Sequence, residues 1–355
     1  MVSTLPRLLI FSAILLMVVF FIYVYPFAAV AHLLVGSAIF QPITYGACLI
    51  LAVLIFYYLR SHSTALILSA LTHYGMGIGF IGFGVVNIAL VLRQLFGIDS
   101  LILGLLSFLV ISALSLKAIA SGRTLKIVEQ HFTSAKISSS VKFVFISDVH
   151  IGSNAKSHLD KICNQIAKLD YDALLIGGDL FDSSAFQLSD LDALKQLDKP
   201  IYYITGNHEY YVKNHQTKIQ ALKDYNLIIL DDEAVSFKDV NLMGIDDHHT
   251  PKTQADIAKR LVRKEAFNLV LVHQPALWGA LPEEADLMLS GHTHNGQLMP
   301  FNLLVRLQFK AVYGRYDNGQ NQAYVSSGAG TWGPPMRLGT QNEIIHLTLS
   351  PSADK

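Results

Sequence analysis

The sequence predicts a bundle of membrane-spanning helices followed by a water-soluble α/β domain. Only five charged side chains occur in residues 1–120, whereas the remaining 235 of the 355 residues carry 49. Beyond residue 140, short apolar runs alternate with segments of helical periodicity, a pattern typical of two sheets flanked by helices. We therefore expect a transmembrane domain over 1–120, a polar connector over 121–140 and a soluble domain over 141–355.

The overall composition narrows the class of protein. The chain is 52% hydrophobic and 15% charged, with a mean hydropathy of +0.39, whereas about 25% of the residues of an ordinary soluble protein are charged. Lys and Arg together number 27, as do Asp and Glu, so the chain lacks the basic surface of a nucleic-acid-binding protein. Two cysteines, Cys48 and Cys163, are too few for a disulfide framework. The sequence does not fix the oligomeric state.

Four apolar stretches are candidates for membrane-spanning helices, which need about 20 residues each. They cover residues 8–28, 43–59, 65–92 and 100–118. Because Lys and Arg favour the cytoplasmic side, placing Arg7 inside also returns Lys117, Arg123 and Lys126 to the cytoplasm. The soluble domain is then anchored in the cell inner membrane and faces the cytoplasm. If the first stretch is instead a signal peptide cleaved near residues 29–31, three spans remain and this orientation is unchanged.

The third apolar stretch carries polar and small residues that membrane helices use for packing. Gly75 and Gly79 form a G-x-x-x-G pair, which allows close approach of helices within the bundle or between two chains. His73 and Asn87 are polar groups at membrane depth, which mark either a functional site or hydrogen bonds between helices.

The soluble domain is expected to contain many short strands. Strand-like runs cover residues 141–146, 173–176, 201–205, 226–230, 240–245, 269–272, 286–289, 323–326 and 343–349. Helices are expected over 157–169, where Ser157 and Asp160 suggest a capping box, and over 188–197.

Polar side chains follow several of these strands. In chain order they are Asp148 and His150, Asp179, Asn207 and His208, His273, and finally His292 and His294. Sites in open α/β sheets gather at the carboxyl ends of strands, so these residues are expected to converge. In D-x-H and H-x-H, alternate residues point the same way and can share an ion. Mixed carboxylate, amide and imidazole donors suit Mn²⁺, Fe or Zn²⁺, so the sequence predicts a pair of metal ions.

This ordered set resembles the calcineurin-like metallophosphoesterase superfamily over about residues 141–350. The segments 292–297 and 328–337 are similar to its membrane-associated bacterial branch, although Asn295 stands where that branch is expected to have glycine. The resemblance implies a four-layered α/β/β/α sandwich. It also implies one ion held by Asp148, His150, Asp179 and His294, and a second held by Asp179, Asn207, His273 and His292. Asp179 would bridge the two ions, and His208 would be a catalytic residue that binds neither.

The resemblance implies a membrane-anchored phosphoesterase that hydrolyses a phosphate ester or pyrophosphate by attack of a metal-bridging hydroxide. Two divalent ions are expected, with Mn²⁺ first and Fe or Zn²⁺ as alternatives. The expected partner is a phosphorylated small molecule or a lipid, UDP-diacylglucosamine being one candidate. One alternative is a non-catalytic sensor or scaffold that binds a phosphorylated ligand at the membrane. Another is a transporter or channel with a regulatory phosphoesterase domain.

Several residues beside the motifs have two interpretations each. Asp182 can orient a metal ligand or cap a helix. Trp332 and Arg337 can line the cleft, where Arg337 would suit a phosphate, or can close the fold. Residues 209–210 are either neighbours of the ligands or plain loop. Residues 248–249 are expected in a substrate-side or exposed loop rather than among the ligands.

Overall fold

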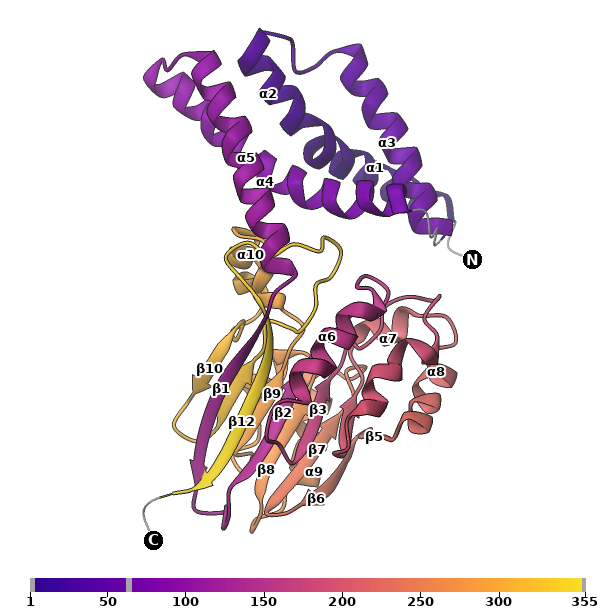
Figure 1. Ribbon diagram of the computed structural model, residues 1–355, viewed down its shortest axis with the longest axis vertical. Coiled ribbons are helices and arrows are strands. Elements are labelled where there is room, and N and C mark those ends of the chain that lie inside the picture. The colour runs from indigo at the N-terminus through magenta and orange to yellow at the C-terminus, as the bar shows by residue number, and fades with distance from the viewer. Residues whose placement is uncertain (1–3, 62–65, 353–355) are drawn as a thin grey trace. The chain divides into compact units, whose positions relative to one another are not determined.

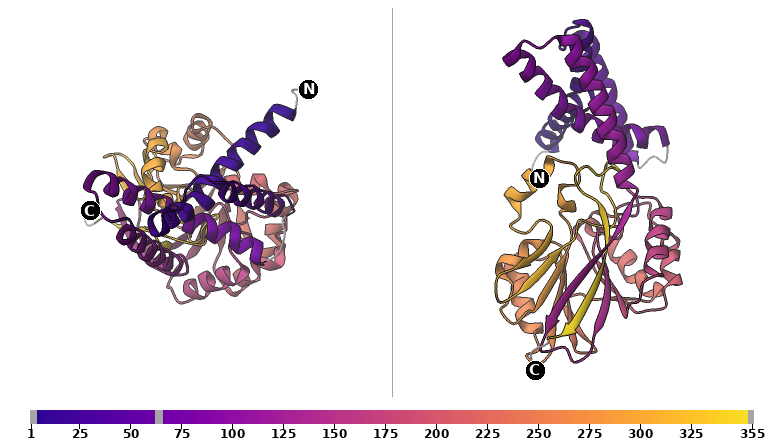
Figure 2. Two further views of the ribbon diagram at one scale, coloured as in Figure 1. Left: turned by 90° about the horizontal axis from the view of Figure 1, so that it is seen from above. Right: turned by 60° about the vertical axis from the view of Figure 1, so that its left-hand side comes forward.

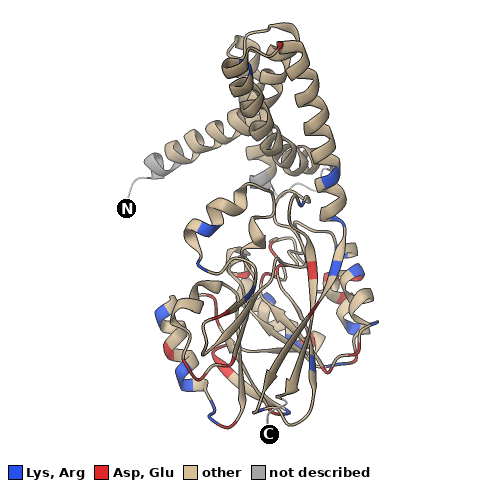
Figure 3. Ribbon diagram, turned by 90° about the vertical axis from the view of Figure 1, so that its left-hand side faces the viewer, with Lys and Arg blue, Asp and Glu red and all other residues tan. Residues whose placement is uncertain are grey.

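The computed structural model describes residues 4–61 and 66–352, which divide into two compact units (Figure 1). The helical unit comprises Met1–Ala120 together with Gly333–Met336. The sandwich unit comprises Ser121–Trp332 together with Arg337–Lys355. Charged residues are concentrated in the sandwich unit, as the sequence predicts (Figure 3).

The helical unit consists of apolar helices. These are α1 (Thr4–Val18), the π-helical turn η1 (Val19–Val24), α2 (Tyr25–Val35), α3 (Pro42–Ser61), α4 (Leu66–Phe96) and α5 (Ser100–Gly122). Among the described residues, three helical stretches have the length and composition to cross a membrane, namely Leu9–Val35, Ile67–Phe96 and Ser100–Gly122. The apolar part of α3, Pro42–Tyr58, is shorter. Residue 65, at the start of the third expected span, lies outside the described residues, and the described parts of all four expected spans are helical. Their number as membrane crossings stays a prediction.

A proline explains the π-helical turn in the first helical stretch. Pro26 has no N–H, so the carbonyl of Ile22 lacks its usual helical donor and the backbone widens just before it. Gly79 of α4 packs on this carbonyl so closely that a Cβ would lie 1.7 Å from the oxygen. A Cβ at Gly75, one turn earlier, would meet the same stretch at 3.0 Å. The G-x-x-x-G pair therefore packs within the chain.

The polar residues of α4 have hydrogen-bonding neighbours inside the helical unit. Nδ1 of His73 lies 3.4 Å from the hydroxyl of Ser69, one turn away. The amide of Asn87 donates to the carbonyl of Phe83 (2.7 Å) and accepts from the hydroxyl of Tyr25 (3.0 Å). These contacts favour a packing role for both residues over a separate functional site.

The sandwich unit contains two mixed sheets of six strands each. The first has the order β1-β12-β2-β3-β4-β5, built from β1 (Leu125–Ser134), β2 (Val141–Ile146), β3 (Ala173–Gly177), β4 (Ile201–Ile204), β5 (Leu227–Ile229) and β12 (Asn342–Pro351). The second has the order β10-β11-β9-β8-β7-β6, built from β6 (Glu233–Phe237), β7 (Val240–Ile245), β8 (Phe267–Val272), β9 (Leu287–Ser290), β10 (Gly314–Asp317) and β11 (Gln322–Val325). Strands β2 to β5 are mutually parallel, as are β7, β8, β9 and β11.

Side-chain alternation along the strands builds three apolar layers, one between the sheets and one on each outer face. Figure 2 shows the two sheets with helices on their outer sides. On β2, Phe143 faces the layer between the sheets and Ile146 faces the helices on the first sheet. Those helical segments are α6 (Lys156–Ile166), η2 (Leu188–Gln196), α8 (His215–Ala221) and η3 (Leu222–Tyr225). On the other side, α9 (Pro251–Leu261) and η4 (Pro275–Ala280) cover the second sheet. The α/β/β/α sandwich is therefore confirmed.

Three local predictions were wrong. The expected connector 121–140 contains β1, which pairs in parallel with β12 along ten residues. Most β1 side chains are at least partly exposed, because β1 is an edge strand. Its sequence therefore lacks the apolar run by which the other strands were predicted. The expected capping box is absent from α6, since Ser157 lies inside the helix and Ala155 precedes it without a side-chain cap. The expected helix over 188–197 is the 3₁₀ segment η2.

Candidate metal centre

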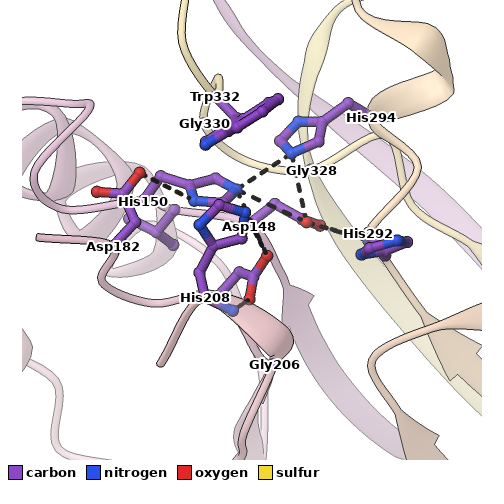
Figure 4. A network of polar contacts seen from close by, with 12 residues as sticks. Asp148, His150, Asp182, Gly206, His208, His292, His294, Gly328, Gly330 and Trp332 are labelled. Atoms are coloured by element: carbon purple, nitrogen blue, oxygen red, sulfur yellow. Dashed lines mark hydrogen bonds and ion pairs between the residues drawn. The ribbon is translucent and has the colours of Figure 1, made fainter. Parts of the chain in front are cut away.

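The polar residues expected in the site follow the carboxyl ends of strands from both sheets. Asp148 and His150 follow β2, Asp179 follows β3, Asn207 and His208 open the short helix α7 (Asn207–Tyr211) after β4, His273 follows β8, and His292 and His294 follow β9. Several of them point toward one another at one end of the sandwich unit (Figure 4).

Five of these residues have left-handed backbone conformations. The φ angles are 55° at Asp148, 52° at His150, 52° at Asp179, 71° at His292 and 48° at His294. Such conformations are uncommon outside glycine and cost of the order of 1–3 kcal/mol each. Because the surrounding fold has to supply this energy, their concentration at one place indicates a site built for function rather than for stability.

One cluster of potential ligand atoms is formed by Asp148, His150 and His294. The two imidazole Nε2 atoms lie 3.1 Å apart. The Asp148 Oδ1 atom is 3.5 Å from Nε2 of His294 and 3.9 Å from Nε2 of His150. All three residues are buried. Two imidazole nitrogens and a carboxylate oxygen that converge in this way form a donor set suited to a divalent cation.

A second cluster is formed by Asp179, His273 and His292. Nε2 of His273 lies 3.1 Å from Asp179 Oδ2 and 3.3 Å from Nδ1 of His292. The same Asp179 Oδ2 atom lies 3.7 Å from Nε2 of His150, so this carboxylate stands between the two clusters. Oδ1 of Asn207 is buried and has no hydrogen-bond partner among the described residues, which leaves it available as a further ligand.

Neighbouring acceptors fix the orientation of two imidazoles. Nδ1 of His273 lies 2.9 Å from the carbonyl oxygen of Gly177 and donates to it, which leaves Nε2 free to bind a cation. Nδ1 of His150 lies 3.3 Å from Asp182 Oδ2, an ion-pair contact, and Asp182 is itself held by hydrogen bonds that it accepts from the backbone N–H and the hydroxyl of Ser153. Of the two interpretations of Asp182, the geometry therefore favours orientation of an imidazole.

Protonation in the two clusters is governed by burial and by mutual charge. Burial opposes ionisation of Asp179, but its imidazole neighbours, His273 foremost, bring its pKa below the usual value. Burial lowers the pKa of His292 to about 3, and burial together with His150 lowers the pKa of His294. These two imidazoles are neutral at pH 7, the form that binds metal. Burial lowers the pKa of His273, but Asp179 outweighs it and the net shift is upward, so cation binding there would release a proton.

Glu209 ties together two of the loops that carry the candidate ligands. Its carboxylate is fully buried and accepts hydrogen bonds from the backbone N–H groups of Asp179 (3.1 Å), Leu180 (2.7 Å), Phe181 (3.2 Å) and Gly206 (2.7 Å). Burial and the nearby Asp179 carboxylate raise the pKa of Glu209 to about 7. Glu209 thus holds the loop after β3 against the loop after β4 and positions Asp179.

His208 lies at the edge of the two clusters. Its backbone N–H donates to Asp179 Oδ1 (2.8 Å), and its Nε2 lies 4.0 Å from Asp179 Oδ2. The imidazole makes edge contacts with Tyr211 and Trp332, at ring-centroid distances of 5.4 and 5.5 Å. Both aromatic side chains are exposed, so His208 stands where the site opens to solvent.

Arg337 closes the fold and has little capacity left for a phosphate. Its guanidinium is completely buried and donates to Oδ1 of Asn342 (2.8 Å) and to the carbonyls of His294 (2.8 Å), Ser327 (2.5 Å) and Gly330 (2.6 Å). Burial lowers the pKa of Arg337 to about 10, which leaves it charged at pH 7. These contacts favour the second interpretation of Arg337, since it fixes the backbone that carries His294.

Arg337→Lys is expected to lower the free energy of unfolding by about 3 kcal/mol. The single ammonium group of lysine cannot replace the four hydrogen bonds that the guanidinium donates, so buried carbonyl oxygens are left without a donor. Thermal unfolding of the full chain in detergent measures the change. Arg260→Lys, at an exposed position of α9, is the matched control and should leave Tm unchanged. A wild-type Tm with a raised KM would instead assign Arg337 to substrate binding.

The histidines after β7 lie outside the candidate ligand groups. Nε2 of His249 is 2.6 Å from Asp232 Oδ2, and His248 packs against the ring of Tyr210, whose hydroxyl donates to Asp246. Neither histidine belongs to any of the three groups of described residues whose ligand atoms converge. This arrangement agrees with their expected place in a loop.

Comparison with known proteins gives consistent matches. Residues 141–296 match the family model described as calcineurin-like phosphoesterase. A Helicobacter pylori protein described as an uncharacterized metallophosphoesterase is 37% identical over 239 residues, 64% of each chain. A Danio rerio transmembrane protein with metallophosphoesterase domain is 32% identical over 63% of this chain and 57% of that protein. A solved dimetal phosphatase from Danio rerio aligns over 61% of this chain and all of that chain, with 12% identity and a TM-score of 0.39. The chain thus matches about 64% of the length of the Helicobacter protein.

Proposed function

Because the sandwich unit belongs to the calcineurin-like phosphoesterase superfamily, we propose that this chain is a membrane-anchored, metal-dependent phosphoesterase that hydrolyses a phosphate ester or pyrophosphate bond. The observation that carries the proposal is the pair of buried ligand clusters with Asp179 Oδ2 between them, 3.1 Å from His273 and 3.7 Å from His150. Two adjacent cation sites of this kind suit a phosphoryl group, whose negative oxygens need positive charge on more than one side.

The residues present fit two divalent cations. Asp148, His150, Asp179 and His294 would hold one ion, and Asp179, Asn207, His273 and His292 would hold the other. Two observations support this division. Oδ1 of Asn207 has no hydrogen-bond partner among the described residues and can serve as a ligand, and the Nε2 atoms of His150 and His294 lie close enough to bind the same ion. The donor set suits Mn²⁺ best, with Fe or Zn²⁺ as alternatives. When bound, such ions supply Lewis-acid activation of water and neutralise phosphoryl charge.

His208 is the residue of this chain that we assign to the reacting phosphate. Its imidazole is at the solvent-facing edge of the clusters, held by the backbone hydrogen bond to Asp179 and by contacts with Tyr211 and Trp332. Burial lowers its pKa, and a neutral imidazole still presents one N–H. That N–H would donate a hydrogen bond to a phosphoryl oxygen or to the leaving oxygen as negative charge develops there.

The substrate is proposed to be a phosphate group close to the membrane, with lipid-linked molecules such as UDP-diacylglucosamine as candidates. Helix α5 ends at Gly122 and β1 begins at Leu125, so two residues join an apolar helix to the first sheet. At about 3.5 Å per residue, such a linker keeps β1 within roughly 10 Å of the end of α5. Lys117, Arg123 and Lys126 flank this junction and support a cytoplasmic sandwich unit on the inner membrane.

Metal-dependent turnover by the purified full-length chain tests the proposal. The protein is stripped with a chelator and assayed with and without Mn²⁺ on bis-p-nitrophenyl phosphate, p-nitrophenyl phosphate and UDP-diacylglucosamine. We expect hydrolysis only after Mn²⁺ is restored, and the preferred compound distinguishes a diester, a monoester and a pyrophosphate. Hydrolysis that survives complete metal removal would contradict the proposal. Bound metal without hydrolysis of any compound would favour the sensor or scaffold alternative.

A further inference from the structure

One short segment of the sandwich unit exposes most of that unit's apolar surface. Beyond residue 120, the described chain has eight large exposed apolar side chains, and five lie between Met299 and Leu307. They are Met299, Phe301, Leu303, Leu304 and Leu307, with exposed fractions from 46% to 84%. Except for Met299, they belong to helix α10 (Phe301–Gln308), and none of the eight described residues of α10 is buried. We call these five residues the α10 patch. Soluble surfaces rarely gather apolar side chains in this way without a partner.

The helix that carries this patch is firmly attached to the candidate metal centre. Phe309, directly after α10, is buried, and its ring lies 5.4 Å from the imidazole of His292. At the other end, the backbone of Asn302 approaches Gly296 so closely that a Cβ there would lie 2.3 Å from it. The exposed side chains are therefore held outward by a fixed backbone that continues from the loop carrying His292 and His294.

The charges around the patch indicate the kind of partner. Residues 299–316 contain no Asp or Glu, whereas Arg306 and Lys310 are exposed beside the apolar side chains. An apolar helix face bordered by Lys and Arg is the pattern of helices that lie in a membrane interface, where cations bind lipid phosphates. The chain reaches its bilayer through a two-residue linker after α5, so a lipid surface lies within reach of this domain.

An exposed tryptophan adjoins the same segment. The backbone N–H of Trp332 donates to Oε1 of Gln297, and Nε2 of Gln297 donates back to the Trp332 carbonyl, both at 3.0 Å. The Trp332 side chain is 53% exposed. Indole rings are enriched at membrane interfaces because they join an apolar body to a polar N–H.

We propose that α10 is an interfacial helix whose apolar patch inserts into the bilayer that anchors this chain. Arg306 and Lys310 bind anionic headgroups, and the loop with His292 and His294 is thereby held at the membrane surface. A phosphate at headgroup depth then reaches the metal centre without leaving the membrane. The insertion of α10 is independent of which reaction the site performs.

Depth-dependent fluorescence quenching of the full chain tests this proposal. In a background in which Cys48 and Cys163 are replaced by Ala, Leu304→Cys is labelled with a small fluorophore. The protein is reconstituted in vesicles of phosphatidylcholine and phosphatidylglycerol at 3:1, with a fraction of the lipid carrying a nitroxide high on its acyl chain. Lys259→Cys, exposed on α9, is the matched control. We expect the lipid nitroxide to quench the label at 304 at least threefold more than the label at 259, and aqueous iodide to show the reverse order.

Two outcomes would overturn the insertion of α10. Equal iodide quenching at positions 304 and 259 would show that the patch stays in water. Protection from both quenchers would show that protein, rather than lipid, covers the patch. A label at Gln308→Cys provides a second measurement, because adding Leu304→Glu and Leu307→Glu should lower its quenching by lipid. Since neither readout requires turnover, the insertion and the proposed hydrolase activity can fail separately.

Discussion

Asp179→Asn is expected to reduce kcat by about a thousandfold, because it removes the one negative charge shared by both ligand clusters. Asp179 Oδ2 faces Nε2 of His273 at 3.1 Å and Nε2 of His150 at 3.7 Å. An asparagine whose Oδ1 still accepts the N–H of His208 turns an NH2 group toward both sites, and this group cannot bind a cation. Turnover of bis-p-nitrophenyl phosphate at saturating Mn²⁺, together with metal content per chain, measures the effect.

The fold should survive this substitution, so lost activity can be assigned to the site. Asparagine retains Oδ1, which accepts the backbone N–H of His208 at 2.8 Å. Asp192→Asn is the matched control, since this exposed carboxylate pairs with Lys195 on the surface, and its turnover should stay within twofold of wild type. Wild-type turnover by Asp179→Asn with two metal ions bound would show that Asp179 does not bridge them.

The positions of the candidate site residues could be predicted because each follows a strand with a clear apolar pattern. Strands β3, β4, β8 and β9 are buried along their whole length, and β2 is buried at every position except Lys142. Their sequences are therefore largely apolar runs, and the polar site residues follow them. The end of such a run locates the carboxyl edge of the sheet. The prediction of the site did not require the order of the strands within each sheet, because both sheets present the carboxyl ends of these strands to the same region.

The supporting residues could not be assigned from sequence, because their partners are distant along the chain. Glu209 accepts hydrogen bonds from backbone groups about 30 residues earlier. Arg337 donates to the carbonyl of His294, 43 residues earlier. No local pattern distinguishes either residue from a charged loop residue, and their burial depends on how the loops between the strands fold back. Sequence alone therefore left two interpretations open for each.

Some elements escaped prediction for different reasons. A signal for α9 was present, because Thr250 caps the helix by accepting the N–H of Thr253 and Pro251 occupies the first turn. The sequence of α10 is misleading in another way: its leucines suggest a buried segment, but in the structure they are exposed. A sequence rule that assigns apolar residues to a core therefore fails at α10, where none of the described residues is buried.

His208→Ala is expected to lower kcat by about 10²- to 10⁴-fold while both metal ions remain bound. The hydrogen bond that orients Asp179 comes from the backbone of residue 208, so alanine preserves it and removes only the imidazole. Single-turnover rates with Mn²⁺ and metal content per chain are the two measurements. His131→Ala, at an exposed position on β1, is the matched control and should match wild type in both.

The metal content of His208→Ala separates two roles for this imidazole. Ligand atoms of His150, Asp182 and His208 also converge within 4.8 Å, an arrangement in which His208 itself would bind a cation. In that case metal and activity would fall together. If His208 instead serves the leaving oxygen, metal stays bound and the loss of rate grows as the leaving group becomes more basic. A phenyl ester should therefore be affected more than the corresponding p-nitrophenyl ester, because the p-nitrophenolate needs less help to depart. An equal loss for both esters would place the hydrogen bond of His208 on a non-leaving phosphoryl oxygen.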